Sequence, residues 1–196
     1  MNPARGDGYG QGAREIGVLA LQGGFAAHMR ALAAAGLTPR EVRTGRDLEG
    51  LGGLVLPGGE STAQLRLIGR GQLEGPLRAF GGSGRPILAT CAGLILAARA
   101  VRPAQPTLGW LDVAVDRNAY GRQLDSFEAE DDSGQRRLIF IRAPRITAVG
   151  AGVEVLVRLH GEPVLVRQGQ VWGAAYHPEL GSEPDGPSLH AQVFGA

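Results

Sequence analysis

The only cysteine of the chain stands where a short apolar run gives way to a helical pattern. Residues 86–90 predict a buried strand and residues 94–100 predict a helix, so Cys91 falls at the turn between the two. At a helix N-terminus, unpaired N–H groups and the helix dipole favour a thiolate over a thiol. The small residues Ala89 and Gly93 allow the sharp turn that presents a nucleophile in this way. The position therefore indicates a nucleophile, and the alternative is a cysteine that acts as a small core hydrophobe.

A base and a group to orient it follow near the C-terminus, in the tripeptide His177-Pro178-Glu179. Pro178 disfavours helical angles at His177, and in an extended segment residues two apart project to the same side. The Glu179 carboxylate can then bind one ring nitrogen of His177 and leave the other to act as a base. Together with Cys91, these residues predict acyl transfer through a thioester, although a His-Pro-Glu tripeptide also occurs in ordinary loops. The remaining three histidines are interpreted as structural or surface positions: His28, His160 and His190.

The composition narrows the class of protein. The chain has 196 residues, 43% hydrophobic and 20% charged, which is typical of one soluble globular domain. A net charge of +1 argues against a nucleic acid or a membrane surface as partner, and there is no apolar run of about 18 residues to span a bilayer. Every basic residue is arginine, which excludes a P-loop lysine, a Schiff-base lysine and a lysine general base. A single cysteine excludes an intrachain disulfide and a cysteine-cluster zinc site, and it suits a reducing cytoplasm.

The first half of the chain alternates between strand and helix patterns. Residues 16–21 predict a strand buried on both faces, and a helix over residues 25–35 follows, with Gly36 at its C-cap. Further strands are expected at residues 39–43 and 54–56, and further helices over residues 61–68 and 72–80. This order predicts a single-domain three-layer α/β/α sandwich, flavodoxin-like, with a mostly parallel central sheet. The domain is expected to span residues 16–196, after a disordered N-terminal extension at residues 1–15 that has no signal-peptide core.

The second half is dominated by short strand patterns. Strands are expected at residues 110–115, 138–141, 153–159, 163–167 and 171–176. The acidic stretch at residues 128–132 is interpreted as a solvated turn. The sequence stops soon after Ala191, which leaves little room for a final helix.

Two glycine-containing loops end predicted strands, as Cys91 does. Gln22 opens the first of them, and residues 57–62 form the second, so all three segments are expected at the ligand-binding edge of the sheet. Glycines before a helix can turn N–H groups toward an anion, and Ser61 or Thr62 would cap the helix. The alternative is a glycine turn followed by an ordinary N-cap, and the missing lysine excludes a P-loop.

A series of motifs along the chain resembles one family. The sequence resembles the class I glutamine amidotransferases and, among them, the glutaminase subunits of pyridoxal 5′-phosphate synthase, over about residues 16–181. The cysteine and the His-x-Glu alone would fit any triad glutaminase, so the later motifs carry the closer likeness. The motifs lie at residues 20–23, 56–62, 90–96, 116–123, 125–128, 140–144 and 177–180.

The resemblance implies roles for particular residues. Cys91, His177 and Glu179 would form the catalytic triad. An arginine suits the α-carboxylate of glutamine and a carboxylate suits its α-ammonium group. Backbone N–H groups of Ala92 and of Gly58 or Gly59 would stabilise the oxyanion, and Gln22 would contact the substrate loop. The implied glutamine-binding residues are Gly59, Glu60, Ser61, Arg117, Ile141 and Arg142.

By the same resemblance, the expected activity is hydrolysis of L-glutamine to glutamate and ammonia in the cytoplasm, without a metal or cofactor. Ammonia would pass to a separate (β/α)8-barrel synthase subunit that builds pyridoxal 5′-phosphate. The lack of lysine fits this division, because imine chemistry must then take place on another chain. Two alternatives stay open: a triad glutaminase that serves another synthase, for instance in histidine formation, and a catalytically silent α/β module that binds a ligand or regulates a partner.

Overall fold

The computed structural model describes residues 15–117, 119, 126–181 and 186–195. The expected extension at residues 1–15 lies outside this part of the chain except for Glu15, which belongs to the first strand. Residues 118 and 120–125 also lie outside it, and all of them except residue 124 belong to two of the family motifs. Within the described ranges, no helix combines the length and the apolar character needed to cross a membrane.

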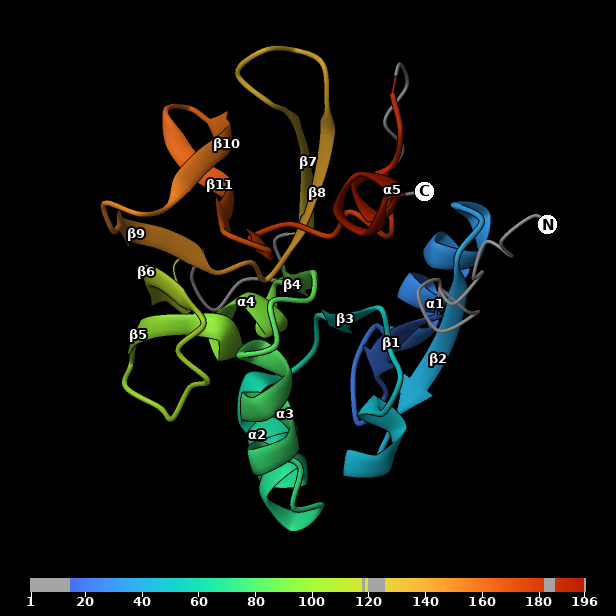
Figure 1. The fold of residues 1–196 in the computed structure, drawn as a ribbon. Coiled ribbons are helices and arrows are strands. Elements are labelled where there is room, and N and C mark those ends of the chain that lie inside the picture. The colour runs from blue at the N-terminus through green and yellow to red at the C-terminus, as the bar shows by residue number, and fades with distance from the viewer. Residues whose placement is uncertain (1–14, 118, 120–125, 182–185, 196) are drawn as a thin grey trace, which may run out of the picture.

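A seven-stranded sheet forms the centre of the molecule, in the order β10-β11-β12-β4-β3-β1-β2 (Figure 1). Five neighbouring strands are parallel, and β10 and β11 continue the sheet antiparallel at one edge. All residues of β3 and β4 are buried, as expected for parallel strands covered on both faces. The strands are β1 (Glu15–Leu19), β2 (Thr38–Val42), β3 (Gly53–Leu56), β4 (Ile87–Thr90), β10 (Glu154–Leu159), β11 (Glu162–Gln168) and β12 (Val171–Ala174).

Helices cover both faces of this sheet. The connection from β1 to β2 and the connection from β3 to β4 run in opposite directions along the strand order, so right-handed crossovers place their helices on opposite faces. The first connection contains α1 (Phe25–Ala34), which packs against the C-terminal α5 (Leu189–Phe194). The second contains α2 (Ser61–Arg70) and α3 (Glu74–Gly81), and α2 packs against α4 (Ala92–Ala97). The three-layer fold and its mostly parallel sheet are therefore confirmed.

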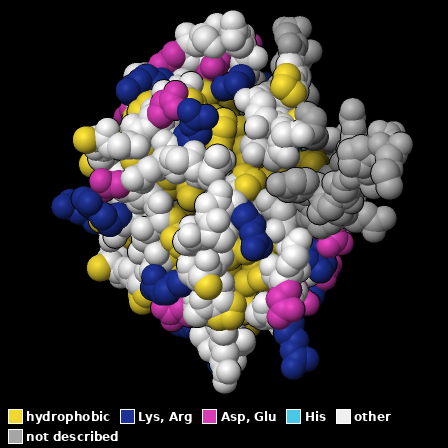
Figure 2. Space-filling view, viewed as in Figure 1, with side chains coloured by type: hydrophobic (Ala, Val, Ile, Leu, Met, Phe, Trp, Pro, Cys, Tyr) yellow, Lys and Arg dark blue, Asp and Glu magenta, His cyan; other side chains and the backbone are white. Residues whose placement is uncertain are grey.

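Smaller sheets complete the fold. Strands β5 (Ala98–Arg102), β6 (Leu111–Asp116) and β9 (Arg145–Val149) form one sheet, and β7 (Ser126–Glu130) pairs with β8 (Arg137–Ile141) in a hairpin. A short 3-10 helix, η2 (Gly45–Leu48), links β2 to β3. The β7–β8 hairpin stands out from the body in Figure 1. Dark blue and magenta side chains are interspersed over the face in Figure 2, in keeping with the small net charge.

Three sequence-based expectations about these elements are wrong. The helix expected to reach residue 100 ends at Ala97, because the following residues pair with β6 as β5, and this pairing outweighs their helix propensity. The acidic stretch is not only a turn, because its first three residues belong to β7 and Glu128 forms an ion pair with Arg137 of β8. A final helix is present after all, capped at its start by Ser188, whose hydroxyl accepts from the Ala191 N–H.

Most other predicted elements agree with the structure to within two residues at each end. Gly36 adopts a φ of +75° just after α1, as a helix-ending glycine does. Strand β9 was not predicted.

The order of the parallel strands decides where the loops meet. Strands β12, β4, β3 and β1 are neighbours and point the same way, so their carboxyl ends share one edge. The segments that follow them contain His177, Cys91, the Gly58–Gly59 turn and Gln22, respectively. This edge brings the predicted site residues together.

Candidate active site

Cys91 occupies a strained turn between β4 and α4. Its backbone angles are φ 47° and ψ −104°, outside the conformations that side-chain-bearing residues normally adopt. The Cys91 N–H donates to the carbonyl oxygen of Ala174 at 2.9 Å, which ties the turn to the end of β12. A Cβ atom on Gly93 would lie 2.0 Å from the Leu56 carbonyl oxygen, so a glycine lets α4 approach β3 this closely. The turn expected from small neighbours is therefore present.

His177 and Glu179 make the contact that their spacing predicted. The Nδ1 atom of His177 lies 2.7 Å from Oε1 of Glu179, and the Glu179 side chain is almost completely buried. The backbone N–H of His177 donates to the Ile139 carbonyl oxygen at 2.8 Å, which anchors this segment to β8. Because the carboxylate occupies Nδ1, the ring presents Nε2 as its free nitrogen.

The thiol and the imidazole flank the same glycine. A Cβ atom on Gly58 would lie 2.5 Å from Cε1 of His177 and 3.4 Å from Cβ of Cys91. His177 Nε2 is buried, and no atom of the described residues gives it a hydrogen bond of good geometry. Burial alone would lower the pKa of His177, but its interactions with the Cys91 sulfur and the Glu179 carboxylate outweigh burial and raise that pKa to about 10. The surroundings of His177 therefore favour a protonated imidazole beside the Cys91 sulfur.

Behind Glu179 lie two histidines and a threonine that the sequence analysis did not connect with the site. His28 Nε2 is 3.3 Å from Glu179 Oε2 and 3.1 Å from Thr90 Oγ1, and His28 Nδ1 is 2.8 Å from His190 Nε2. A surface position is thus wrong for His28 and His190, which are fully buried, whereas His160 is exposed in the turn between β10 and β11. His28 lies four residues before Leu32, on the buried side of α1, and this spacing is the signal that could have placed it inside.

Hydrogen bonds join the loops after β1 and β3. Gln22 Oε1 accepts from the Glu60 N–H at 2.8 Å, and the Gln22 carbonyl oxygen accepts from Gln64 Nε2 at 3.0 Å. The Gly58 carbonyl oxygen accepts from the Gly24 N–H at 2.9 Å. Gln22 therefore contacts the loop before α2 and helps to fix its backbone.

Glu60, and not Ser61 or Thr62, caps α2. Its carboxylate accepts from the backbone N–H groups of Thr62 and Ala63 and from the Thr62 hydroxyl. The hydroxyl hydrogen bond is the largest influence on the pKa of Glu60, which is lowered. Arg117 Nη2 lies 3.7 Å from the same carboxylate. The Ser61 hydroxyl instead donates to Gln105 Oε1 at 3.1 Å. Glu60 is therefore a fixed negative charge at the helix start.

These groups surround a cavity of about 250 Å³. A space of this size suits a small ligand such as an amino acid. Of the predicted site residues, Gln22, Ala92 and Glu179 do not line it, and Glu179 lies behind the imidazole ring. No cluster of metal-binding side chains occurs in the part of the chain that the structure describes. The predicted residues that line the cavity are Gly58, Gly59, Glu60, Ser61, Cys91, Arg117, Ile141, Arg142 and His177, joined by Gly24 and Ile95.

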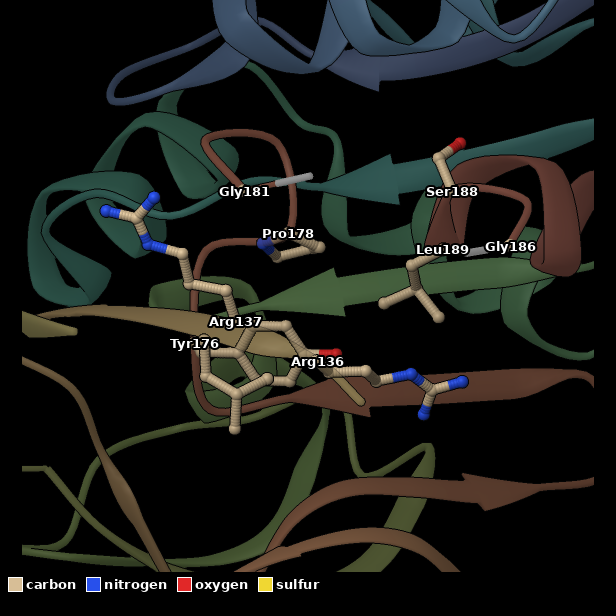
Figure 3. Close-up of a pocket in the computed structure, with 9 residues that line it drawn as sticks. Arg136, Arg137, Tyr176, Pro178, Gly181, Gly186, Ser188 and Leu189 are labelled. Carbon is tan, nitrogen blue, oxygen red and sulfur yellow. The ribbon is translucent and has the colours of Figure 1, made fainter. Parts of the chain in front are cut away.

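A second cavity, of about 240 Å³, lies beside Tyr176 and Pro178 (Figure 3). Arg136, Arg137 and Ser188 are among the residues that line it, and the Ser188 hydroxyl caps α5. It contains none of the predicted catalytic or substrate-binding residues. The chemistry therefore points to the cavity at Cys91.

Comparisons with known proteins identify the family of the chain. The model of the SNO glutamine amidotransferase family matches residues 18–189. The chain is 48% identical over 185 residues to the pyridoxal 5′-phosphate synthase subunit PdxT of Shouchella clausii (strain KSM-K16), covering 92% of this chain and 93% of the relative. It is 49% identical over 172 residues to the subunit of the same name from Corynebacterium diphtheriae, covering 86% and 93%.

Solved structures give the same result. A crystal structure titled as a glutamine amidotransferase superposes with a TM-score of 0.82 at 42% identity, covering 92% of this chain and 99% of the other. A chain in the structure of PurLQS from Thermotoga maritima, at 18% identity and a TM-score of 0.64 over 93% and 95% of the two chains, shares the fold. With most of its length matched by the family model and by relatives at nearly half identity, the chain belongs to the SNO glutamine amidotransferase family.

Proposed function

We propose that this chain hydrolyses L-glutamine to L-glutamate and ammonia through a thioester on Cys91, and that the ammonia serves a separate pyridoxal 5′-phosphate synthase subunit. The observation that carries the proposal is the arrangement at Cys91. A cysteine in a strained strand-to-helix turn lies beside the unpaired Nε2 of His177, whose other nitrogen is held by Glu179. This is the arrangement of nucleophile, base and orienting carboxylate that acyl transfer requires.

The first half of the reaction forms the thioester and releases ammonia. The Cys91 thiolate attacks the side-chain carbonyl carbon of glutamine and forms a C–S bond, while the carbonyl oxygen takes the negative charge. The N–H of Ala92, together with an N–H of Gly58 or Gly59, would stabilise that oxyanion, each contributing about 3 kcal/mol. His177, protonated at Nε2, gives its proton to the amide nitrogen as the C–N bond breaks, and ammonia leaves.

The second half regenerates the enzyme. Neutral His177 removes a proton from a water molecule, which attacks the thioester carbon. The C–S bond breaks, glutamate leaves, and the thiolate and imidazolium are restored. Glu179 remains ionised throughout, because it stabilises the imidazolium and fixes its tautomer.

The charges around the cavity suit a free amino acid. The Arg117 and Arg142 guanidinium groups would bind the α-carboxylate of glutamine, and Glu60 would attract its α-ammonium group. The lowered pKa of Glu60 keeps this carboxylate ionised at neutral pH. Ser61, Gly59 and the backbone of Ile141 complete the expected contacts.

The partner and the compartment follow from the relatives and the composition. The relatives from Shouchella clausii and Corynebacterium diphtheriae are named as subunits of pyridoxal 5′-phosphate synthase, which supports the same assembly here. We place the imine chemistry on a (β/α)8-barrel partner, because this chain has no lysine to perform it. A lone unpaired cysteine supports a reducing cytoplasm, and residues 16–196 would form the amidotransferase domain after the extension at 1–15.

The test is a comparison of glutamate release by the wild-type chain and its Cys91→Ala variant, each with the synthase subunit of the same cell. The Glu41→Gln variant, changed at an exposed ion pair with Arg43 that does not line the cavity, serves as the matched control. We expect glutamate release from the wild type and the control, and none above background from Cys91→Ala. Turnover by Cys91→Ala would refute the thioester mechanism, and inactivity of the wild type would favour a silent regulatory module. Ammonia transfer only to an unrelated synthase would favour a glutaminase of another pathway.

A further inference from the structure

A buried polar cluster lies on the far side of Glu179 from His177. It consists of His28 on α1, Thr90 at the end of β4 and His190 on α5, and all three residues are 0% exposed. Thr90 and His190 both contact the His28 ring, and His28 in turn lies beside the second oxygen of Glu179. Polar side chains are rarely buried this completely without a hydrogen-bonding purpose.

The charge states in this cluster follow from its burial. Burial would raise the pKa of Glu179, but hydrogen bonding to His177 leads the influences that outweigh burial, and the pKa is lowered. Burial lowers the pKa of His28 to about 4 and that of His190 to about 3. At neutral pH the cluster therefore holds one carboxylate and two neutral imidazoles, each with a single ring proton.

Only one arrangement of these protons avoids repulsion. If His28 Nε2 carried no proton, its lone pair would face the Glu179 carboxylate across 3.3 Å in a buried site. With the proton on Nε2, His28 Nδ1 accepts from His190 Nε2–H at 2.8 Å. His190 Nδ1 is then an acceptor, and it is the ring nitrogen of this pair that has no partner among the described residues. The opposite assignment would leave a buried N–H donor without a partner, which is costlier.

The geometry of the Nε2 proton explains why Thr90 belongs to the cluster. His28 Nε2–H donates to the Thr90 hydroxyl at 3.1 Å. Glu179 Oε2 lies 3.3 Å from the same nitrogen, where it is attracted by the N–H dipole without a well-aligned hydrogen bond. Thr90 directly precedes Cys91, so the contact that orients His28 comes from the strand that ends at the nucleophile. His28 lies beside one oxygen of the carboxylate, Oε2, and His177 binds the other, Oε1.

We propose that His28, oriented by Thr90 and His190, is a positioning residue that fixes the Glu179 carboxylate and thereby keeps His177 Nε2 directed at Cys91. The inference rests on the proposed glutaminase function. His28 does not line the substrate cavity, so its contribution falls on the chemical steps and not on glutamine binding. A residue that orients a functional side chain without contacting the substrate typically contributes about 10–100-fold to activity.

Two variants of similar polarity separate positioning from packing. In His28→Gln the amide nitrogen takes the place of ring Nε2 and retains a donor toward Glu179. In His28→Asn the shorter side chain places its amide oxygen near ring Nδ1, where it accepts from His190 Nε2–H, and no donor reaches the place of ring Nε2 beside Glu179. Glutamate release is measured with the synthase subunit present, as kcat and KM separately, and thermal melts compare the folded states.

We expect kcat of His28→Asn to fall about 10–100-fold, with KM within about twofold of wild type, and kcat of His28→Gln to stay within about fivefold. Equal kcat values for the two variants would overturn the proposal. If neither variant folds, His190→Leu removes only the outer donor, and we expect a several-fold loss of kcat; an unchanged kcat would overturn the proposal. An inactive wild type would refute the glutaminase function itself, which is a different outcome.

Discussion

A substitution at Gly58 would displace the imidazole of His177, the proposed proton donor, and leave His177 itself unchanged. A Cβ atom at this position would lie 2.5 Å from His177 Cε1 and 3.2 Å from its Nδ1. Ordinary contact begins at 3.4 Å, so in Gly58→Ala the ring must move by about 0.9 Å, the difference between 3.4 and 2.5 Å. A shift of about 1 Å in a catalytic group lowers rates by about 100-fold, or about 2.7 kcal/mol of transition-state stabilisation.

The assay is release of glutamate by the complete enzyme, coupled to glutamate dehydrogenase. Gly69→Ala is the matched control, because a Cβ atom at Gly69 of α2 meets nothing within 4 Å. We expect the control to keep wild-type kcat and Gly58→Ala to lose about 100-fold, with both variants folded by circular dichroism. A Gly58→Ala enzyme within about threefold of wild type would refute the assignment of His177 to the proton transfers.

Three further predictions concern packing, pH and substrate binding. Gly93→Ala places a Cβ atom 2.0 Å from the Leu56 carbonyl oxygen, so its free energy of unfolding should fall by about 2–4 kcal/mol in urea titrations. The control Gly75→Ala, whose Cβ atom meets nothing within 4 Å, should show no such fall, and equal stabilities of the two variants would contradict the close α4–β3 contact. Because burial lowers the pKa of His28 to about 4, the unfolded chain binds a proton below about pH 6.5 that the folded chain excludes, and stability is lost as the pH falls. Between pH 7 and 5 the wild type should lose about 2 kcal/mol more than His28→Gln in denaturant titrations, and parallel curves would show that His28 is not excluded from protonation. Arg117→Gln should raise KM for glutamine by about 10–100-fold with little change in kcat, and an unchanged KM would remove Arg117 from the glutamine site.

The residue types that meet at the site could be predicted because local sequence patterns indicate them. The apolar run before Cys91, the small residues around it and the His-x-Glu spacing each need only neighbouring residues to be interpreted. The rule that ligands lie at the carboxyl ends of parallel strands then placed Gln22 and Gly58 beside Cys91.

The features that sequence patterns leave undetermined depend on pairing between distant segments. Nothing local indicates that β12 inserts next to β4, although this pairing alone brings His177 to Cys91. Residues 98–102 have helix-forming alanines, and only pairing with β6 makes them a strand. The burial of His190 depends on α5 packing against α1, so its link to Glu179 was invisible before the fold was known.

The chemical identity of Cys91 as the nucleophile is tested most directly by a chloroketone analogue of glutamine and mass spectrometry of the labelled chain. The account predicts one adduct per chain, on the peptide that contains Cys91, formed more slowly when glutamine is present and in proportion to the loss of glutamate release. Full alkylation of Cys91 with glutamate release retained would contradict it.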